Sequence, residues 1–281
     1  MQEFAKGYAP AKALAARMQL RKGDFAAARQ TAKAAGLDTS SIDAVEAYEQ
    51  QDAKTLQDAL DAMPSSDKQK PEYAALLAAD GILTGAEYPS PGKLQDFVET
   101  NSLWGELIAA DAALDQGDLG RAGKIIEEWA EPERTALHEI RIARYERYKG
   151  RFREAVKLSK DALDKASTSN RALIEHINAL LADDRLADAV KLYGDALYKD
   201  LLKPHERWVD ALLVGKDKGW MAANVITSYL QPPGSDEALS LRLLALRAMS
   251  VAGDPRAGVH LQRMAKELPR NPDYLTAQSE Y

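Results

Sequence analysis

Three arginines and a tyrosine stand close together near the middle of the chain: Arg141, Arg144, Arg147 and Tyr148. Residues three or four positions apart lie on the same side of a helix, so the guanidinium groups would form a stripe with the tyrosine beside it. A guanidinium group donates paired hydrogen bonds to a carboxylate. This spacing therefore predicts the recognition of an acidic or carboxylate-bearing segment of a partner protein.

The distribution of charge agrees with this hypothesis. Residues 133–171 contain 11 basic and 6 acidic side chains, whereas residues 37–100 contain 4 basic and 13 acidic ones. The arginine stripe thus lies in a basic island of a chain whose formal net charge is −6. The same residues also fit a solvated helix face with no role in binding, because such charge runs commonly keep a protein in solution. The sequence leaves both interpretations open.

The residue types that commonly carry out catalysis or bind metals do not occur here at the spacings that a catalytic site or a metal site requires. The chain has no cysteine, and its four histidines (His138, His176, His205 and His260) are not paired at the spacing of a helical zinc site. We expect His176 and His205 to be ordinary surface residues. Neither a phosphate-binding glycine loop nor a Gly-x-Ser-x-Gly motif is present. We therefore expect no enzyme activity, no cofactor, no metal and no small-molecule substrate.

Composition and charge narrow the class of partner. A net negative charge opposes general binding to nucleic acid or to an anionic membrane. No apolar run approaches the roughly 18 residues that a membrane-spanning helix needs, and the first residues do not resemble a signal peptide. We expect a protein or peptide partner, no nucleic acid and no membrane insertion. The compartment stays open between cytoplasm and periplasm.

The arginine stripe lies in the first of two expected helices. Apolar and small residues recur every three or four positions in residues 135–149 and again in residues 151–166. Gly150 separates the two stretches, and glycine readily adopts the left-handed conformation that ends a helix. Because β-branched residues nowhere alternate with polar ones, the sequence predicts an all-α fold built from such hairpins.

The hairpin repeats along the chain. Similar turns are expected at positions 117, 150, 184, 218 and 253, at intervals of 33, 34, 34 and 35 residues. Residues 102–281 are therefore predicted to form regular repeats. Residues 1–101 form less regular ones, with turns expected at Gly23, Lys54 and Gly85 and a proline-containing loop at 88–92. Segments 64–66, 231–235 and 268–272 are expected to be loops between hairpins.

This pattern resembles the tetratricopeptide repeat family. That family places a small residue seven positions before the turn, as in Ala110 and Ala143, and an alanine five positions after it, as in Ala155. Ile177 and Leu246 depart from the pattern. The resemblance implies a right-handed superhelix of about seven to eight stacked helix-turn-helix hairpins, whose first helices line a concave groove.

In the family resembled, the concave groove binds peptides or partner domains. The resemblance therefore implies a protein-protein interaction scaffold, and these residues are the partner-binding candidates: Trp104, Arg141, Arg144, Arg147, Tyr148, Arg171, Asn178 and Trp208. The lysine that some members use to grip a terminal carboxylate is replaced here by Ile174. Two other hypotheses stay open. One is a self-assembling homo-oligomeric array, and the other is the accessory arm of a larger envelope or export complex.

Overall fold

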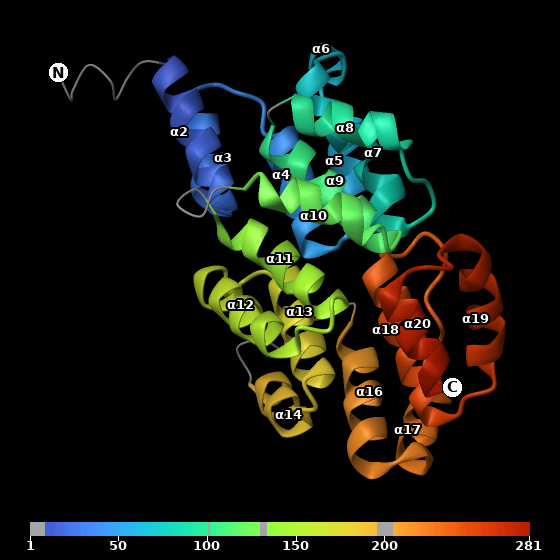
Figure 1. The fold of residues 1–281 in the computed structure, drawn as a ribbon. Coiled ribbons are helices and arrows are strands. Elements are labelled where there is room, and N and C mark those ends of the chain that lie inside the picture. The colour runs from blue at the N-terminus through green and yellow to red at the C-terminus, as the bar shows by residue number, and fades with distance from the viewer. Residues whose placement is uncertain (1–8, 101, 130–133, 196–204) are drawn as a thin grey trace.

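The computed structural model describes residues 9–100, 102–129, 134–195 and 205–281 (Figure 1). Within these ranges the chain forms eighteen α-helices, one short 3₁₀ helix (η1, Pro71–Tyr73) and no strand. The all-α prediction is confirmed. None of the helices in the described ranges is both long and apolar enough to cross a bilayer.

Most helices form antiparallel pairs. The first helices of the pairs, with the unpaired last helix, are α2 (Ala9–Arg21), α4 (Ser40–Gln50), α7 (Ala74–Thr84), α9 (Leu103–Asp115), α11 (Ala136–Tyr148), α13 (Asn170–Ala182), α16 (Glu206–Lys218), α18 (Leu239–Ala252) and α20 (Pro272–Glu280). The second helices are α3 (Phe25–Ala34), α5 (Ala53–Ala62), α8 (Pro91–Glu99), α10 (Leu119–Glu127), α12 (Phe152–Lys165), α14 (Leu186–Gly194), α17 (Trp220–Thr227) and α19 (Arg256–Glu267). A single helical turn, α6 (Ser65–Lys68), lies between α5 and η1.

The first helices also pack on one another. Helices α4, α7, α9, α11 and α13 are neighbours in that order, and α16, α18 and α20 continue as a second group. Side chains from both groups therefore face a common interior. The second helix of each pair lies on the outer side of the first, away from this interior.

Turn residues explain where the helices end. Gly117 and Gly150 have φ values of 68° and 77°, which lie in the left-handed region that glycine adopts most readily. Asp184 takes the same conformation between α13 and α14. The prediction of a turn at Lys54 is wrong, because the left-handed residue is Gln51 and α5 already includes Lys54.

The proline-containing segments differ in part from the expected loops. Pro91 is the first residue of α8, and Pro272 is the first residue of α20, where proline needs no hydrogen-bond donor. The loop predicted at residues 88–92 is therefore shorter than predicted, because it ends before Pro91. Residues 64–66 are not a simple loop either, because Pro64 caps helix α6. Residues 231–235 do connect α17 to α18 without a helix.

The second group of first helices contacts the first group. Arg242 of α18 donates a hydrogen bond of 2.8 Å to the backbone carbonyl of Thr84, which ends α7. Asn271, just before α20, donates one of 2.8 Å to the carbonyl of Asp115, which ends α9. In Figure 1 the red C-terminal helices accordingly lie beside the turquoise and green helices of the first half. The interior is thus enclosed by helices from both halves.

Candidate functional site

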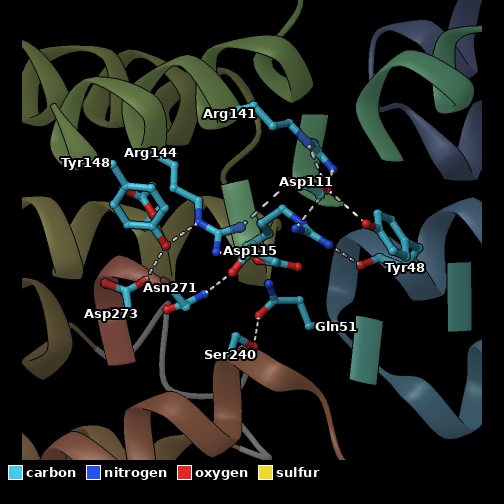
Figure 2. Close-up of polar contacts among 12 residues, drawn as sticks. Tyr48, Gln51, Asp111, Asp115, Arg141, Arg144, Tyr148, Ser240, Asn271 and Asp273 are labelled. Atoms are coloured by element: carbon cyan, nitrogen blue, oxygen red, sulfur yellow. Dashed lines mark hydrogen bonds and ion pairs between the residues drawn. The ribbon is translucent and has the colours of Figure 1, made fainter. Parts of the chain in front are cut away.

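A small cavity lined by both charged and apolar side chains lies where the first helices meet. Its volume is about 60 Å³, and its walls come from α4, α7, α9, α11, α13, α18 and α20. Figure 2 shows charged side chains that converge on it from segments far apart in the sequence. We call the following set the arginine cluster: Arg141, Arg144, Arg147, Arg171 and Arg247 with Glu49, Asp111, Asp115, Glu175, Asp273 and Glu280.

Arg141 lies at the centre of the first part of this cluster and is only 1% exposed. Its guanidinium donates to Glu49 of α4 at 3.0 Å and to Asp111 of α9 at 2.7 Å. Burial by itself would raise the pKa of Asp111. The positive charges of Arg141, Arg171 and Arg144 outweigh burial and hold that pKa below its ordinary value. Asp111 is therefore a carboxylate fixed by arginines of its own chain.

Arg144 connects α9 to the tyrosine of the stripe. It donates to Asp115 at 2.5 Å and to the Tyr148 hydroxyl at 2.8 Å. Tyr148 in turn donates from its hydroxyl to Asp273 of α20, at 2.7 Å. Burial raises the pKa of Asp115, and the charge of Arg144 offsets this effect only in part. Figure 2 shows this chain of contacts from α9 to α20.

Arg147 binds two carboxylates through adjacent edges of its guanidinium group. It donates to Glu175 of α13 at 2.8 Å and to Asp273 at 3.2 Å, so one guanidinium joins α11, α13 and α20. Burial raises the pKa of Glu175 despite the nearby arginine. For Asp273 the order of effects is reversed, because Arg147 overcomes burial and holds the pKa well below its ordinary value. Asp273 is therefore ionised in the folded chain at neutral pH.

Arg171, Asn178 and Arg247 complete the walls. Arg171 donates to the Tyr48 carbonyl at 3.0 Å and lies over the Tyr48 ring at 4.7 Å. Arg247 donates to the side-chain oxygen of Asn178 at 3.2 Å and to Glu280 of α20, also at 3.2 Å. Four of the eight predicted partner-binding residues thus belong to the cluster, and two more, Tyr148 and Asn178, hydrogen-bond to its members.

The two tryptophans of the prediction lie elsewhere. The Trp104 indole donates to the Glu72 carbonyl at 2.8 Å, and its ring stacks on Tyr73. Trp208 is buried in the hydrophobic core formed by the second half of the chain. Neither side chain lines the cavity.

Both interpretations of the arginine stripe assumed an exposed helix face, and that assumption is wrong. Arg141 and Arg147 are buried, and Arg144 is largely covered. The carboxylates that they meet belong to the chain itself. Sequence reasoning did not predict Glu49, Glu175 or Asp273 as their partners, although each of these acids lies in a first helix, as the arginines do. That the acids and the arginines both lie in first helices was the signal from which their pairing could have been predicted.

Three histidines are also buried, contrary to the expectation for His176 and His205. Burial lowers the pKa of His138, His176 and His205 to about 4 each. His176 contacts the Ser159 hydroxyl at 2.9 Å, and His205 contacts the Ser240 hydroxyl at 3.1 Å. In the part of the chain that the structure describes, no three histidine, aspartate or glutamate side chains are grouped to hold a metal ion.

Comparison with known proteins finds no protein-family model that matches the chain and no similar curated protein.

Proposed function

We propose that the chain is a non-enzymatic protein-protein interaction scaffold of the tetratricopeptide type. In this proposal its hairpins follow a right-handed superhelix of about seven to eight repeats, and the first helices bind an acidic segment of a partner on their inner face. The packing of the first helices against one another supports this arrangement, since they direct side chains from seven helices at one cavity. The ion pairs of Arg147 with Asp273 and of Arg247 with Glu280 support an acidic ligand.

The observation that carries the proposal is the way the inner face holds helix α20. Asp273 accepts hydrogen bonds from Arg147 and Tyr148, and Glu280 accepts them from Arg247 and Lys216. Asp273 and Glu280 are seven residues apart, which places both carboxylates on one side of the helix, two turns apart. The inner face therefore already binds an acidic helix, and α20 occupies the place that we assign to the partner segment.

This assignment defines the ligand. A partner helix would need two carboxylates about two turns apart, at the positions that Asp273 and Glu280 now occupy. It would also have to displace α20, because Arg147 and Arg247 cannot satisfy a second pair of carboxylates with the same donors. In this proposal the partner helix can bind only when α20 is released, so the two compete for the same arginines.

Binding of a synthetic peptide tests this exchange. The probe is a fluorescent peptide of residues 269–281, and the protein is the full chain with Asp273→Asn and Glu280→Gln, which weaken the attachment of its own α20. We expect this variant to bind the peptide at least tenfold more tightly than the parent chain does, measured by fluorescence anisotropy. Equal affinity for the parent and the variant would overturn the proposal.

Two controls separate recognition from unfolding. A peptide that carries asparagine and glutamine at the same two positions should lose the binding, because the arginines then meet no carboxylate. A matched protein variant, Asp161→Asn with Asp164→Asn, removes two acids from the outer helix α12 and should bind the peptide as the parent does. Circular dichroism must show equal helix content in all the proteins.

A further inference from the structure

The pair formed by α7 and α8 differs from the other hairpins because it is open. Helix α8 packs mainly on α9 rather than on α7. A groove of about 690 Å³ lies between them, and its lining includes Ala74, Leu77, Ala78 and Phe97 with the acids Asp80 and Glu87. The irregular connection from Gly85 to Ser90 separates the two helices and leaves this groove.

The partial burial of a small residue on α7 indicates what size of occupant would fit in the groove. Ala110 of α9 and Ala143 of α11 stand at the equivalent place, seven residues before the turn, and both are fully buried. Ala78 of α7 is only half-buried. A small residue allows two helices to approach closely. The groove therefore has the shape to accept one further helix packed against α7.

The charges of the groove favour a basic occupant. Asp80 is half-buried among apolar side chains, and burial raises the pKa of its carboxyl group. Within the described ranges no lysine or arginine forms an ion pair with Asp80, and Lys93 on the opposite wall lies over the Phe97 ring instead. Glu87 adds a second, exposed carboxylate. A cationic side chain near Asp80 would be attracted to this rim.

Helix α2 of the chain has the matching features. Leu14 and Met18 are 61% and 54% exposed and lie one turn apart on its outer face. Arg17 and Arg21 share that exposed side, and α2 contains no acidic residue. No residue of α2 lines the groove of its own chain. Arg17 also forms an exposed ion pair of 3.9 Å with Glu72 of the same chain, and the rest of this apolar, basic face is available to a neighbouring molecule.

We propose that α2 of one copy of this protein docks in the α7–α8 groove of a second copy. Leu14 and Met18 would cover the apolar floor around Leu77 and Ala78, and the arginines would lie near Asp80 and Glu87. This inference is independent of acid binding by the arginine cluster, because it uses other surfaces. One helix face buries less area than a standard stable interface, so the association is weak and depends on concentration and salt.

Sedimentation equilibrium of the full chain tests the association. Between about 10 µM and about 1 mM at low salt, the average mass should rise above that of the monomer. Met18→Asp and Leu77→Asp should each weaken the association at least tenfold. Val259→Asp, at a 70% exposed position on α19, is the matched control and should leave it unchanged. A strict monomer over this range would overturn the inference, as would an equal loss in the control.

Cross-linking tests which surfaces meet. Because the chain has no cysteine, Met18→Cys and Leu77→Cys each introduce a unique thiol. After mild oxidation, a mixture of the two variants should give a disulfide-linked dimer that contains one chain of each. Dimers of only one variant, in the same amounts with or without the other, would show that the copies meet elsewhere and would overturn the inference.

A charge exchange provides a second check on the contact. Arg17→Glu with Arg21→Glu, and separately Asp80→Lys with Glu87→Lys, should each weaken self-association. Mixing the two double variants should restore it, because each reversed α2 then meets a reversed groove. If the mixture associates no better than either variant alone, the proposed pairing is wrong.

Discussion

Arg147 and Asp273 form a buried ion pair across 126 positions of sequence, and their contact attaches the last helix to the middle of the chain. The same guanidinium also holds Glu175. Removing either partner of a buried pair leaves a charge without compensation, whereas exposed pairs contribute little. The most sensitive positions of this protein should therefore lie in the arginine cluster.

We expect Arg147→Ala to lower the free energy of unfolding by about 3 to 5 kcal/mol, because Glu175 and Asp273 would then be buried without their cation. Urea unfolding followed by circular dichroism measures the change. Arg185→Ala is the control, because Arg185, just before α14, and Asp188 form an exposed pair that should contribute less than about 1 kcal/mol. Similar losses in both variants would contradict the importance assigned to the buried pair.

A double-mutant cycle on Arg141 and Glu49 should show strong coupling. Arg141→Met by itself leaves the Glu49 carboxylate buried and poorly compensated, with Arg171 3.5 Å away, and should cost about 3 to 5 kcal/mol. Adding Glu49→Gln removes that uncompensated charge, so the double variant should regain at least about 1 kcal/mol relative to Arg141→Met. Additive losses in urea unfolding would mean that the two side chains do not depend on each other.

His205 should make stability depend on pH in a defined direction. Its pKa is lowered by burial to about 4, against an ordinary value of 6.5, so below pH 6.5 the unfolded chain binds a proton that the folded chain does not. This residue alone should lower the free energy of unfolding by about 2 kcal/mol between pH 8 and pH 5.

The variant His205→Gln isolates this effect, because glutamine can still hydrogen-bond to Ser240 but does not titrate. The loss of stability of the parent between pH 8 and pH 5 should exceed that of the variant. The comparison is needed because Asp115 and Glu175, whose pKa values are raised, contribute with the opposite sign. Identical pH profiles for the two proteins would refute the prediction.

The turn at Gly117 should be intolerant of any side chain. A φ of 68° would strain any residue other than glycine at this position. A Cβ there would also lie 2.1 Å from the Arg270 carbonyl oxygen. Gly36 has a similar φ of 69° but no atom within 4 Å of such a Cβ. We expect Gly36→Ala to cost about 1 kcal/mol and Gly117→Ala at least twice as much, by urea unfolding. Equal costs would mean that the approach of Arg270 is not a constraint.

The local sequence predicted the helices well. The apolar period placed α11 and α12 within one residue of their observed ends, and glycine explained the turn at Gly150. These features depend on interactions within one or two helical turns, so a short window of sequence determines them. The missed turn at Gln51 fits this rule, since a left-handed glutamine carries no local signal comparable to glycine.

The sequence by itself also predicted many of the residues that line the interior, although Trp104 and Trp208 do not line the cavity. The spacing of Arg141, Arg144 and Arg147 placed them on one side of α11, and Arg171 and Asn178 line the same cavity from α13. What it could not determine is whether that side is open. Spacing fixes the direction of a side chain on its own helix, but its exposure depends on every other helix that packs there.

Only the tertiary structure decided that the arginines meet acids of their own chain. Asp273 reaches Arg147 because successive helix pairs bring α20 back against α9 and α11, and Arg242 contacts Thr84 through the same return. The contact between Arg147 and Asp273 joins residues 126 positions apart, so no local pattern in the sequence encodes it. The sequence thus determined the helices and their inner faces, and long-range packing determined what those faces hold.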